Sequence, residues 1–150
     1  MLLDVNILVA AHREDHALHE LALAVVDGPC ADGMALCAHT WNGFLRLVTH
    51  AALWRTPTPT AVALEAVSRW RSRPNTRVLG DTRASWEHFD RLCRQHGARG
   101  NGFYDLHLAS LAMGHDQVLV SDDRGFDRIT GLRWRPPEAF SLPACAGNPK

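Results

Sequence analysis

The chain has 150 residues, of which 46% are hydrophobic and 21% charged; this composition excludes a disordered protein and is typical of one globular domain. The formal net charge is zero, so overall charge does not indicate a nucleic-acid partner. The 4 cysteines form no C-x-x-C pair, which argues against a disulfide framework and favours a reducing cytoplasm. The segment MLLDVNILVAAH lacks a basic leader, and no apolar run approaches the roughly 20 residues of a membrane span, so neither a signal peptide nor a membrane protein is expected.

The first half of the chain alternates short apolar runs with helical periodicity. Residues 1–5 are nearly all apolar and predict a buried strand. Apolar residues then recur at the spacing of one helix face over 15–28 and over 41–54, which predicts a helix in each segment. A short apolar run at 34–37 is a strand candidate between the two helices.

The second half continues the alternation. The expected elements are a turn at 56–60, a helix ending at Pro74, a strand at 77–79, a helix capped by Thr82, a helix from the loop 97–102 to about His115, a strand at 117–121, a short helix from Arg124 and a strand at 132–135. Short strands that alternate with helices predict an α/β protein with a parallel sheet covered on both faces. We therefore expect a single three-layer α/β/α domain with a short-stranded, mainly parallel central sheet over 1–140, followed by a C-terminal tail at 141–150.

Three aspartates fall where an α/β fold gathers its functional residues. Asp4 stands at the end of the first strand in LLDVN, and Asp123 follows the strand VLV in SDDRGF. Ligands of open α/β sheets bind beyond the carboxyl ends of the strands, so both side chains are expected there. Asp105 begins the helix DLHLASLAM on the same face as small apolar residues, which predicts a carboxylate that points inward and not into water.

Carboxylates that converge in this way repel one another. Two of them about 4 Å apart cost on the order of 4 kcal/mol at an effective dielectric near 20, so such a cluster requires a shared proton or a cation between its members. Oxygen ligands favour Mg²⁺ or Mn²⁺ over zinc. A cation held there can activate water and stabilise charge on a phosphodiester. The sequence thus predicts a metal site at Asp4, Asp105 and Asp123.

Each acid also has a purely structural explanation. Asp105 could favour a helix N-terminus through the helix dipole, which is worth roughly 0.3–1 kcal/mol. Asp123 could belong to an ordinary turn, and Asp4 could cap a helix that follows the strand. Asp4 is the hardest to explain in this way, because an acid inside an apolar run loses solvation energy unless something pairs with it.

The segments LLDVN at the start of the chain, GNGFYDLHLASLA late in it and VLVSDDRGF shortly afterwards stand in a distinctive order. In that order the chain resembles PIN-domain proteins, and more narrowly the VapC-type toxins of type II toxin–antitoxin modules. The resemblance extends over about residues 1–140 and includes GFLRLVTH and LRWRPP.

The resemblance implies an Mg²⁺-dependent endoribonuclease, with Mn²⁺ as a possible substitute, that cleaves structured RNA such as tRNA or rRNA and inhibits translation. It also implies a cognate VapB-type antitoxin and a homodimer. By position, Asp4, Asp105 and Asp123 match the catalytic, metal-binding acids of the family. Asn6 matches a small polar residue that orients the first acid, and Ser121 a hydroxyl residue that supports the site.

The chain departs from the family at several positions. The family commonly has a glutamate where this chain has Gly43, and some members have an acid at the place of Gly102 or Gly125. Because of these departures, the sequence does not decide whether the site holds one metal ion or two. They also leave open an alternative function, a catalytically weak PIN-like module that binds RNA or antitoxin. A phosphatase of another α/β class is disfavoured, because Asn6 stands where an aspartyl-nucleophile phosphatase would have a general acid.

Basic and histidine residues offer further candidates. Arg13 and Arg124 follow elements near the expected crevice and are predicted to contact the RNA backbone, while Arg46 could contact RNA or pair with an acid of the site. His12, His16 and His19 would form a zinc site only if one helix held all three on one face. A solvated helix face explains them more simply.

Overall fold

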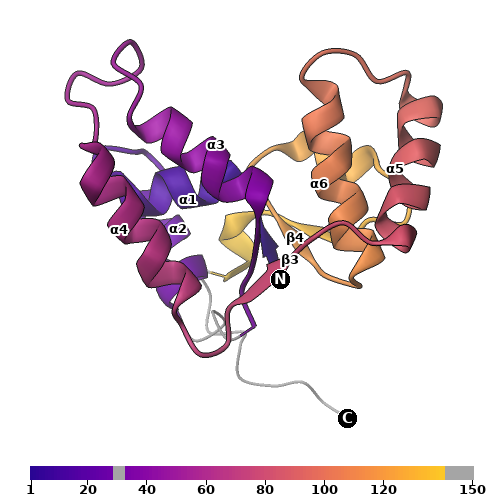
Figure 1. The fold of residues 1–150 in the computed structure, drawn as a ribbon, viewed down its shortest axis with the longest axis horizontal. Helices are drawn as coiled ribbons and strands as arrows, with labels where there is room; N and C mark the ends of the chain where they lie inside the picture. Colours follow the sequence, from indigo (N-terminus) through magenta and orange to yellow (C-terminus); the bar gives the residue numbers. More distant parts are fainter. Residues whose placement is uncertain (29–32, 141–150) are drawn as a thin grey trace.

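A central parallel sheet lies between two groups of helices (Figure 1). The computed structural model describes residues 1–28 and 33–140. The strands are β1 (Leu2–Leu3), β2 (Ala35–Cys37), β3 (Arg77–Leu79), β4 (Leu119–Val120) and β5 (Trp134–Arg135). They form a 5-stranded sheet in the order β3-β2-β1-β4-β5, and every pairing is parallel. The predicted α/β class and three-layer arrangement are confirmed.

The helices divide between the two faces of the sheet. They are α1 (Val5–His12), α2 (His19–Asp27), α3 (Ala38–Val48), α4 (Thr60–Arg71), α5 (Arg83–His96) and α6 (Gly102–Gly114), with short 3-10 helices η2 (Arg124–Arg128) and η3 (Pro137–Phe140). Helices α1 to α4 pack on one side, and α5 and α6 pack against each other on the other side (Figure 1).

Helix α1 corrects the prediction for the start of the chain. The strand expected over 1–5 ends at Leu3, and a helix absent from the prediction begins at Val5. Nearly every residue of this helix is buried, including Ile7, Leu8 and Val9. A helix buried on all sides shows no polar face, so its sequence cannot be distinguished from a buried strand by periodicity.

Two other helices have different bounds from those predicted. Helix α2 begins at His19 instead of Asp15, because residues 14–18 form turns after α1. Helix α3 ends at Val48, well before Trp54. The indole N–H of Trp54 donates to the backbone carbonyl of Leu47 at 2.8 Å and ties the following loop back onto the helix. The predicted cap of α5 is confirmed, since the Thr82 hydroxyl accepts from the backbone N–H of Ser85 at 3.0 Å.

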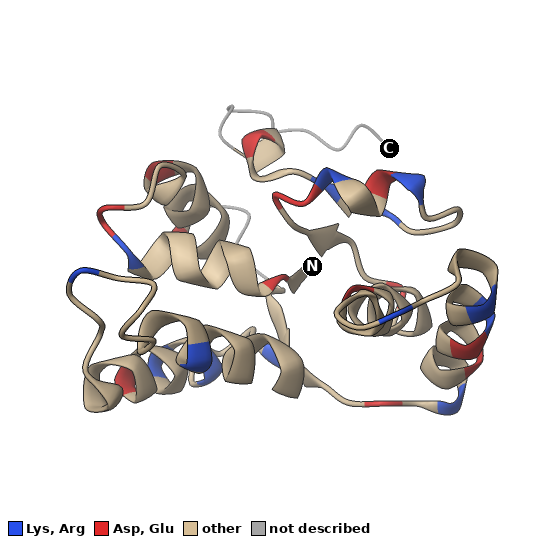
Figure 2. Cartoon of the chain, turned by 90° about the horizontal axis from the view of Figure 1, so that it is seen from above, with Lys and Arg blue, Asp and Glu red and all other residues tan. Residues whose placement is uncertain are grey.

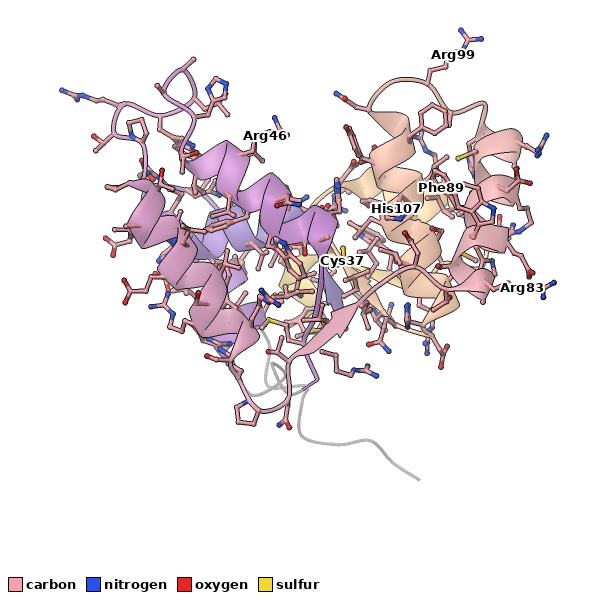
Figure 3. The ribbon with its side chains drawn as sticks, viewed as in Figure 1. Cys37, Arg46, Arg83, Phe89, Arg99 and His107 are labelled. Carbon is pink, nitrogen blue, oxygen red and sulfur yellow. The ribbon has the colours of Figure 1, made fainter. Side chains whose placement is uncertain are left out.

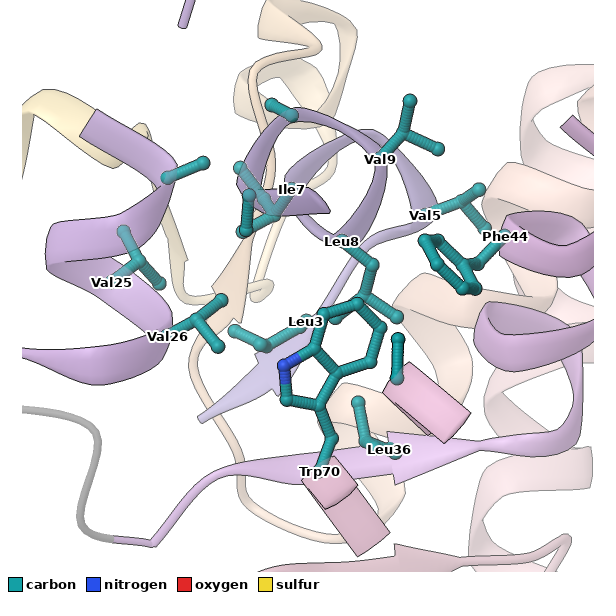
Figure 4. Packing of buried hydrophobic residues seen from close by; sticks show 14 of the residues in the cluster. Leu3, Val5, Ile7, Leu8, Val9, Val25, Val26, Leu36, Phe44 and Trp70 are labelled. Atoms are coloured by element: carbon teal, nitrogen blue, oxygen red, sulfur yellow. The ribbon is translucent and has the colours of Figure 1, made fainter. Parts of the chain in front are cut away.

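The sheet separates two hydrophobic cores. On the first side Phe44 of α3 and Trp70 of α4 meet edge to face with ring centroids 5.0 Å apart, above Leu3 and Leu36 of the sheet (Figure 4). On the other side Leu92 of α5 and a row of small and apolar residues of α6 cover the sheet. Burial of aliphatic and aromatic side chains on both faces holds these very short strands in place.

Charged residues are spread over both helix groups, and Figure 2 shows acidic and basic positions on each of them. This distribution agrees with the formal net charge of zero. Within residues 1–28 and 33–140, no helix is long and apolar enough to cross a membrane. The tail predicted at 141–150 lies outside the described residues.

Candidate metal centre

The three predicted acids line one cavity of about 890 Å³. Its walls come from α1, α3, the beginning of α6 and the segment after β4. Asp4 follows β1, Asp123 follows β4, and Asp105 lies in the first turn of α6. The parallel topology therefore brings together acids that are up to 119 positions apart in the chain (4 and 123).

Asp4 is fixed between the sheet and α1. Its backbone N–H donates to the Val120 carbonyl at 3.0 Å, which continues the pairing of β1 with β4. Its Oδ1 accepts from the backbone N–H of Val5 at 2.6 Å at the start of α1. Its Oδ2 accepts from the Ser121 hydroxyl at 2.6 Å. Both carboxylate oxygens are thus oriented by hydrogen bonds while each keeps a free lone pair.

Ser121 links three parts of the site through one hydroxyl. Besides donating to Asp4, its Oγ accepts from the Asn6 side-chain amide at 3.0 Å and from the backbone N–H of Asp123 at 3.0 Å. Ser121 is fully buried. The side-chain oxygen Oδ1 of Asn6 also accepts from the backbone N–H of Asp122 at 3.4 Å. The hydroxyl network therefore fixes the first acid relative to the loop that carries the last.

Asp105 and Asp123 are more open to solvent than Asp4. Asp123 is exposed, and its Oδ1 accepts from the backbone N–H of Gly125 at 2.7 Å, which caps η2. Asp105 is also exposed on the cavity wall. The prediction that its carboxylate points away from water is wrong: the buried residues of α6 begin at Leu106, and Asp105 just before them is exposed where it lines the cavity.

The electrostatic environment favours a cation. Burial raises the pKa of Asp4 to about 6, and repulsion from Asp105 and Asp123 adds to the rise against the lowering effect of its hydrogen bonds. The pKa of Asp105 is raised as well, first by partial burial and then by the charge of Asp123. Carboxylates held close enough to repel one another, and offering only oxygen donors, suit a hard divalent ion.

In the described part of the chain, no three or more acidic, histidine or cysteine side chains form a group that could hold a metal ion. This does not conflict with an Mg²⁺ site, because Mg²⁺ usually keeps several waters and takes only one or two protein carboxylates. The donor set fits such an ion better than zinc, which prefers a tetrahedral cage with histidine or cysteine ligands.

Gly43 leaves no room for the glutamate common in the family. A Cβ atom at this position would lie 2.7 Å from Val5 Cγ2 and 3.1 Å from Val5 Cγ1, so α1 and α3 touch here. At Gly125 a Cβ would lie 2.9 Å from Asp123 Oδ1, whereas Gly102 faces open space. Close packing against Val5 thus disfavours a side chain at position 43, whereas a side chain at position 125 would displace the Asp123 carboxylate.

The two predicted RNA-binding arginines, Arg13 and Arg124, are not among the described residues that line this cavity. Arg13 makes two hydrogen bonds to the Asp15 carboxylate, at 2.8 and 2.7 Å, and covers the Trp54 ring. Arg124 forms an ion pair with Glu138, in which the guanidinium Nη2 lies 3.8 Å from the carboxylate Oε1. Arg46, in contrast, lines the cavity from α3 and is exposed (Figure 3).

The three clustered histidines do not share a face. His12 is the last residue of α1, and its Nε2 lies 3.2 Å from the Thr58 hydroxyl. His19 is the first residue of α2, and its Nδ1 lies 2.9 Å from the backbone carbonyl oxygen of Ala10. His16 lies in the turn between the helices. The one-helix arrangement that a zinc site required is therefore absent from these residues.

Sequence reasoning missed a ring pair across the cavity. The His39 ring, at the start of α3, stacks on Tyr104 at the start of α6 with centroids 5.2 Å apart and an interplanar angle of 19°. Both residues line the cavity. No local pattern could reveal this contact, because the two residues lie in different helices far apart in the chain.

Replacing Ser121 with alanine removes all three contacts of its hydroxyl. We expect the free energy of unfolding to fall by about 1–3 kcal/mol, because buried polar partners are left unpaired. Metal affinity should fall about 10- to 100-fold, as for other residues that orient ligands. Urea unfolding and Mg²⁺ titration monitored by thermal shift measure the two effects.

Ser110→Ala is the matched control. Ser110 is also buried, but its hydroxyl donates only to the His107 carbonyl within α6, at 2.7 Å. Its loss should leave metal affinity unchanged. Equal losses of metal affinity in the two variants would contradict the role given to Ser121.

Comparisons with known proteins agree with this geometry. The PIN domain family model matches residues 1–132. Ribonuclease VapC43 of Mycobacterium tuberculosis is 33% identical over 139 residues, covering 91% of this chain and 95% of the relative. Ribonuclease VapC31 of the same organism is 34% identical over 139 residues, covering 91% of this chain and 98% of the relative.

A solved structure shares the fold. VapBC-1 from nontypeable Haemophilus influenzae matches with a TM-score of 0.63 and 20% identity, over 91% of this chain and 97% of that one. The sequence relatives extend over nearly the whole domain and carry the family assignment. The chain belongs to the PIN-domain family and, within it, to the VapC ribonucleases, which confirms the predicted family, fold and enzyme class, a toxin-type endoribonuclease.

Proposed function

We propose that this ribonuclease is the toxin of a type II toxin–antitoxin module and hydrolyses structured RNA, such as tRNA or rRNA, with Mg²⁺ held at Asp4, Asp105 and Asp123. The observation that carries the metal assignment is the convergence of these three carboxylates on one cavity, with mutual repulsion that a cation would relieve. Mn²⁺ has the same preference for oxygen ligands and is the expected substitute.

Each residue has a separate task in this proposal. Asp4, oriented by Ser121 and the start of α1, provides the most firmly fixed ligand. Asn6 holds the Ser121 hydroxyl in place. Asp105 and Asp123, being exposed, can complete the ligand set or orient water. The bound ion would supply activation of water and stabilisation of charge on the phosphodiester.

The RNA backbone would enter the cavity beside Arg46. This arginine makes no ion pair among the described residues and lines the cavity together with the acids. An unpaired guanidinium is a suitable partner for a phosphate. Arg13 and Arg124 remain candidates for RNA contacts farther from the cleaved bond.

The proposed partners are a cognate VapB-type antitoxin and a second copy of the chain, in the cytoplasm. Solved structures with the same fold include VapBC2 from Rickettsia felis bound to a DNA fragment from their promoter, and FitAB bound to the IR36 DNA fragment. These structures support an antitoxin partner for this chain by family analogy.

The direct test is cleavage of total cellular RNA by the purified protein with Mg²⁺, Mn²⁺ or EDTA. Metal-dependent fragments are expected. Asp105→Asn should reduce their rate of formation at least about 100-fold, because several kcal/mol of charge stabilisation are lost. Asp127→Asn is the matched control, since Asp127 is exposed on η2 and does not line the cavity.

A different result would favour the alternative function. If the wild-type protein bound RNA or antitoxin but released no fragments with either metal, the absence of the family's glutamate at Gly43 would explain a catalytically weak binding module. Cleavage that persists in EDTA or in Asp105→Asn would contradict the metal site itself.

A further inference from the structure

A second, smaller pocket lies beside the cavity. It has a volume of about 170 Å³ and shares Asp105 and Asp123 with the large cavity. Its other walls come from the end of α5, the loop that follows it and η2. The two carboxylates therefore stand between two compartments, and a strand that passes over them would extend from one into the other.

Basic side chains line the small pocket together with the two acids. Arg128 of η2, Arg99 of the loop after α5 and His96 at the end of α5 all line it. All three are exposed, and within residues 1–28 and 33–140 none takes part in an ion pair. Exposed basic side chains that form no ion pair are suited to an anionic ligand.

Arg128 is the best placed of these cations. It lines the small pocket together with Asp105 and Asp123, the two acids that the pocket shares with the large cavity. Arg99 extends from the loop between α5 and α6 toward solvent and is the more peripheral member (Figure 3). Gly102, the first residue of α6, also lines the pocket, and no atom lies within 4 Å of the place of its Cβ.

We propose that this pocket is a phosphate subsite, in which Arg128 binds the RNA backbone next to the scissile phosphate, with Arg99 and His96 at its rim. The inference rests on the proposed ribonuclease function and adds the path of the strand: across the acids, from the cavity beside Arg46 into the Arg128 pocket. The small volume fits a sugar–phosphate unit better than a drug-sized ligand, which takes roughly 300–1,000 Å³.

Direct binding of labelled RNA tests the subsite separately from cleavage. The variants are made in an Asp4→Asn background, which is expected to stop cleavage and leaves every residue of the small pocket in place. The probes are fluorescein-labelled single-stranded U12 and A12, titrated in Mg²⁺ at several salt concentrations. Cleavage by the otherwise wild-type protein is measured in parallel and reports on the proposed function alone.

Arg128→Ala should weaken binding of both probes by about 3- to 10-fold and reduce the slope of log affinity against log salt by about 0.7, the value for one phosphate contact on a single strand. Arg128→Lys should retain the slope because it retains the charge. Arg83→Ala is the control, since Arg83 lies on α5 away from the pocket and is paired with Glu87.

Two outcomes would overturn the subsite. One is an Arg128→Ala variant whose RNA affinity and salt slope equal those of the background, while the same substitution in the otherwise wild-type protein changes Mg²⁺ affinity, because Arg128 would then act only on Asp105. The other is an absence of U12 and A12 binding by the background protein, because backbone contacts should not depend on base sequence. Loss of antitoxin binding alone in Arg128→Ala would assign the pocket to the antitoxin instead.

Discussion

Asp4→Asn is expected to abolish metal-dependent cleavage and, at the same time, to stabilise the metal-free protein. The pKa of Asp4 is raised from 3.8 to about 6, which corresponds to about 3 kcal/mol against the ionised form in the folded state. Above pH 6 the folded protein therefore bears the full unfavourable effect of this charge. As the pH falls from 6 toward 3.8, the folded state takes up the proton first and the effect disappears.

The neutral amide of asparagine has no such charge. At pH 8 we expect the free energy of unfolding of Asp4→Asn to exceed that of the wild type by about 2–3 kcal/mol, which raises the melting temperature by about 4–10 °C. At pH 4 the difference should be small. Mg²⁺ should raise the melting temperature of the wild type and not that of the variant.

Thermal unfolding at both pH values, with and without Mg²⁺, measures these effects. Asp127→Asn, on the exposed surface of η2, serves as the control and should behave as the wild type. A less stable Asp4→Asn protein at pH 8 would show that the hydrogen bonds from Ser121 and Val5 outweigh the burial of the charge. That result would contradict the conclusion that burial and the neighbouring acids disfavour the ionised form of Asp4.

Restoring the family's glutamate at Gly43 should damage the protein instead of improving the site. A Cβ at this position would lie 2.7 Å from a methyl group of Val5, so either α3 or α1 must shift. Overpacking of this kind typically costs 1–3 kcal/mol. Because Val5 follows Asp4 directly, the shift should also disturb the hydrogen bond that orients the carboxylate.

The neighbouring position offers a matched comparison. Asn42 lines the same cavity but is exposed, so Asn42→Glu should change the free energy of unfolding by less than about 0.5 kcal/mol. A fourth acid there should tighten Mg²⁺ binding, because affinity rises with the number of charged ligands. Urea unfolding and Mg²⁺ titration of both variants test the pair. A stable Gly43→Glu protein with tighter Mg²⁺ binding would refute the packing argument.

The elements that the sequence predicted well are those with one buried face. Helix α4 shows its apolar residues at regular spacing, and the start of α5 is marked by Thr82, so both were predictable. Helix α1 was not, because its residues are buried all round. All five strands were located, and β3 has the predicted bounds, but β1, β4 and β5 are shorter than predicted.

The site was predictable in composition and less so in detail. Asp4 and Asp123 follow parallel strands, a place that topology fixes. The exposure of Asp105 depends on where the first turn of α6 meets the cavity. Helix periodicity predicts which residues share a face but not where along the helix the cavity begins. The position of Arg128 beside Asp105 depends on how η2 folds over the end of the sheet.

The two separate cores also determine how the geometry of the site is maintained. Asp4 lies between β1 and α1 beside the first core, whereas Asp105 lies on α6, which packs in the second. Close-packed interiors transmit strain, so a change of side-chain volume in either core would displace one acid relative to the other. The spacing of the acids is therefore set jointly by two separately packed interiors that meet at the sheet.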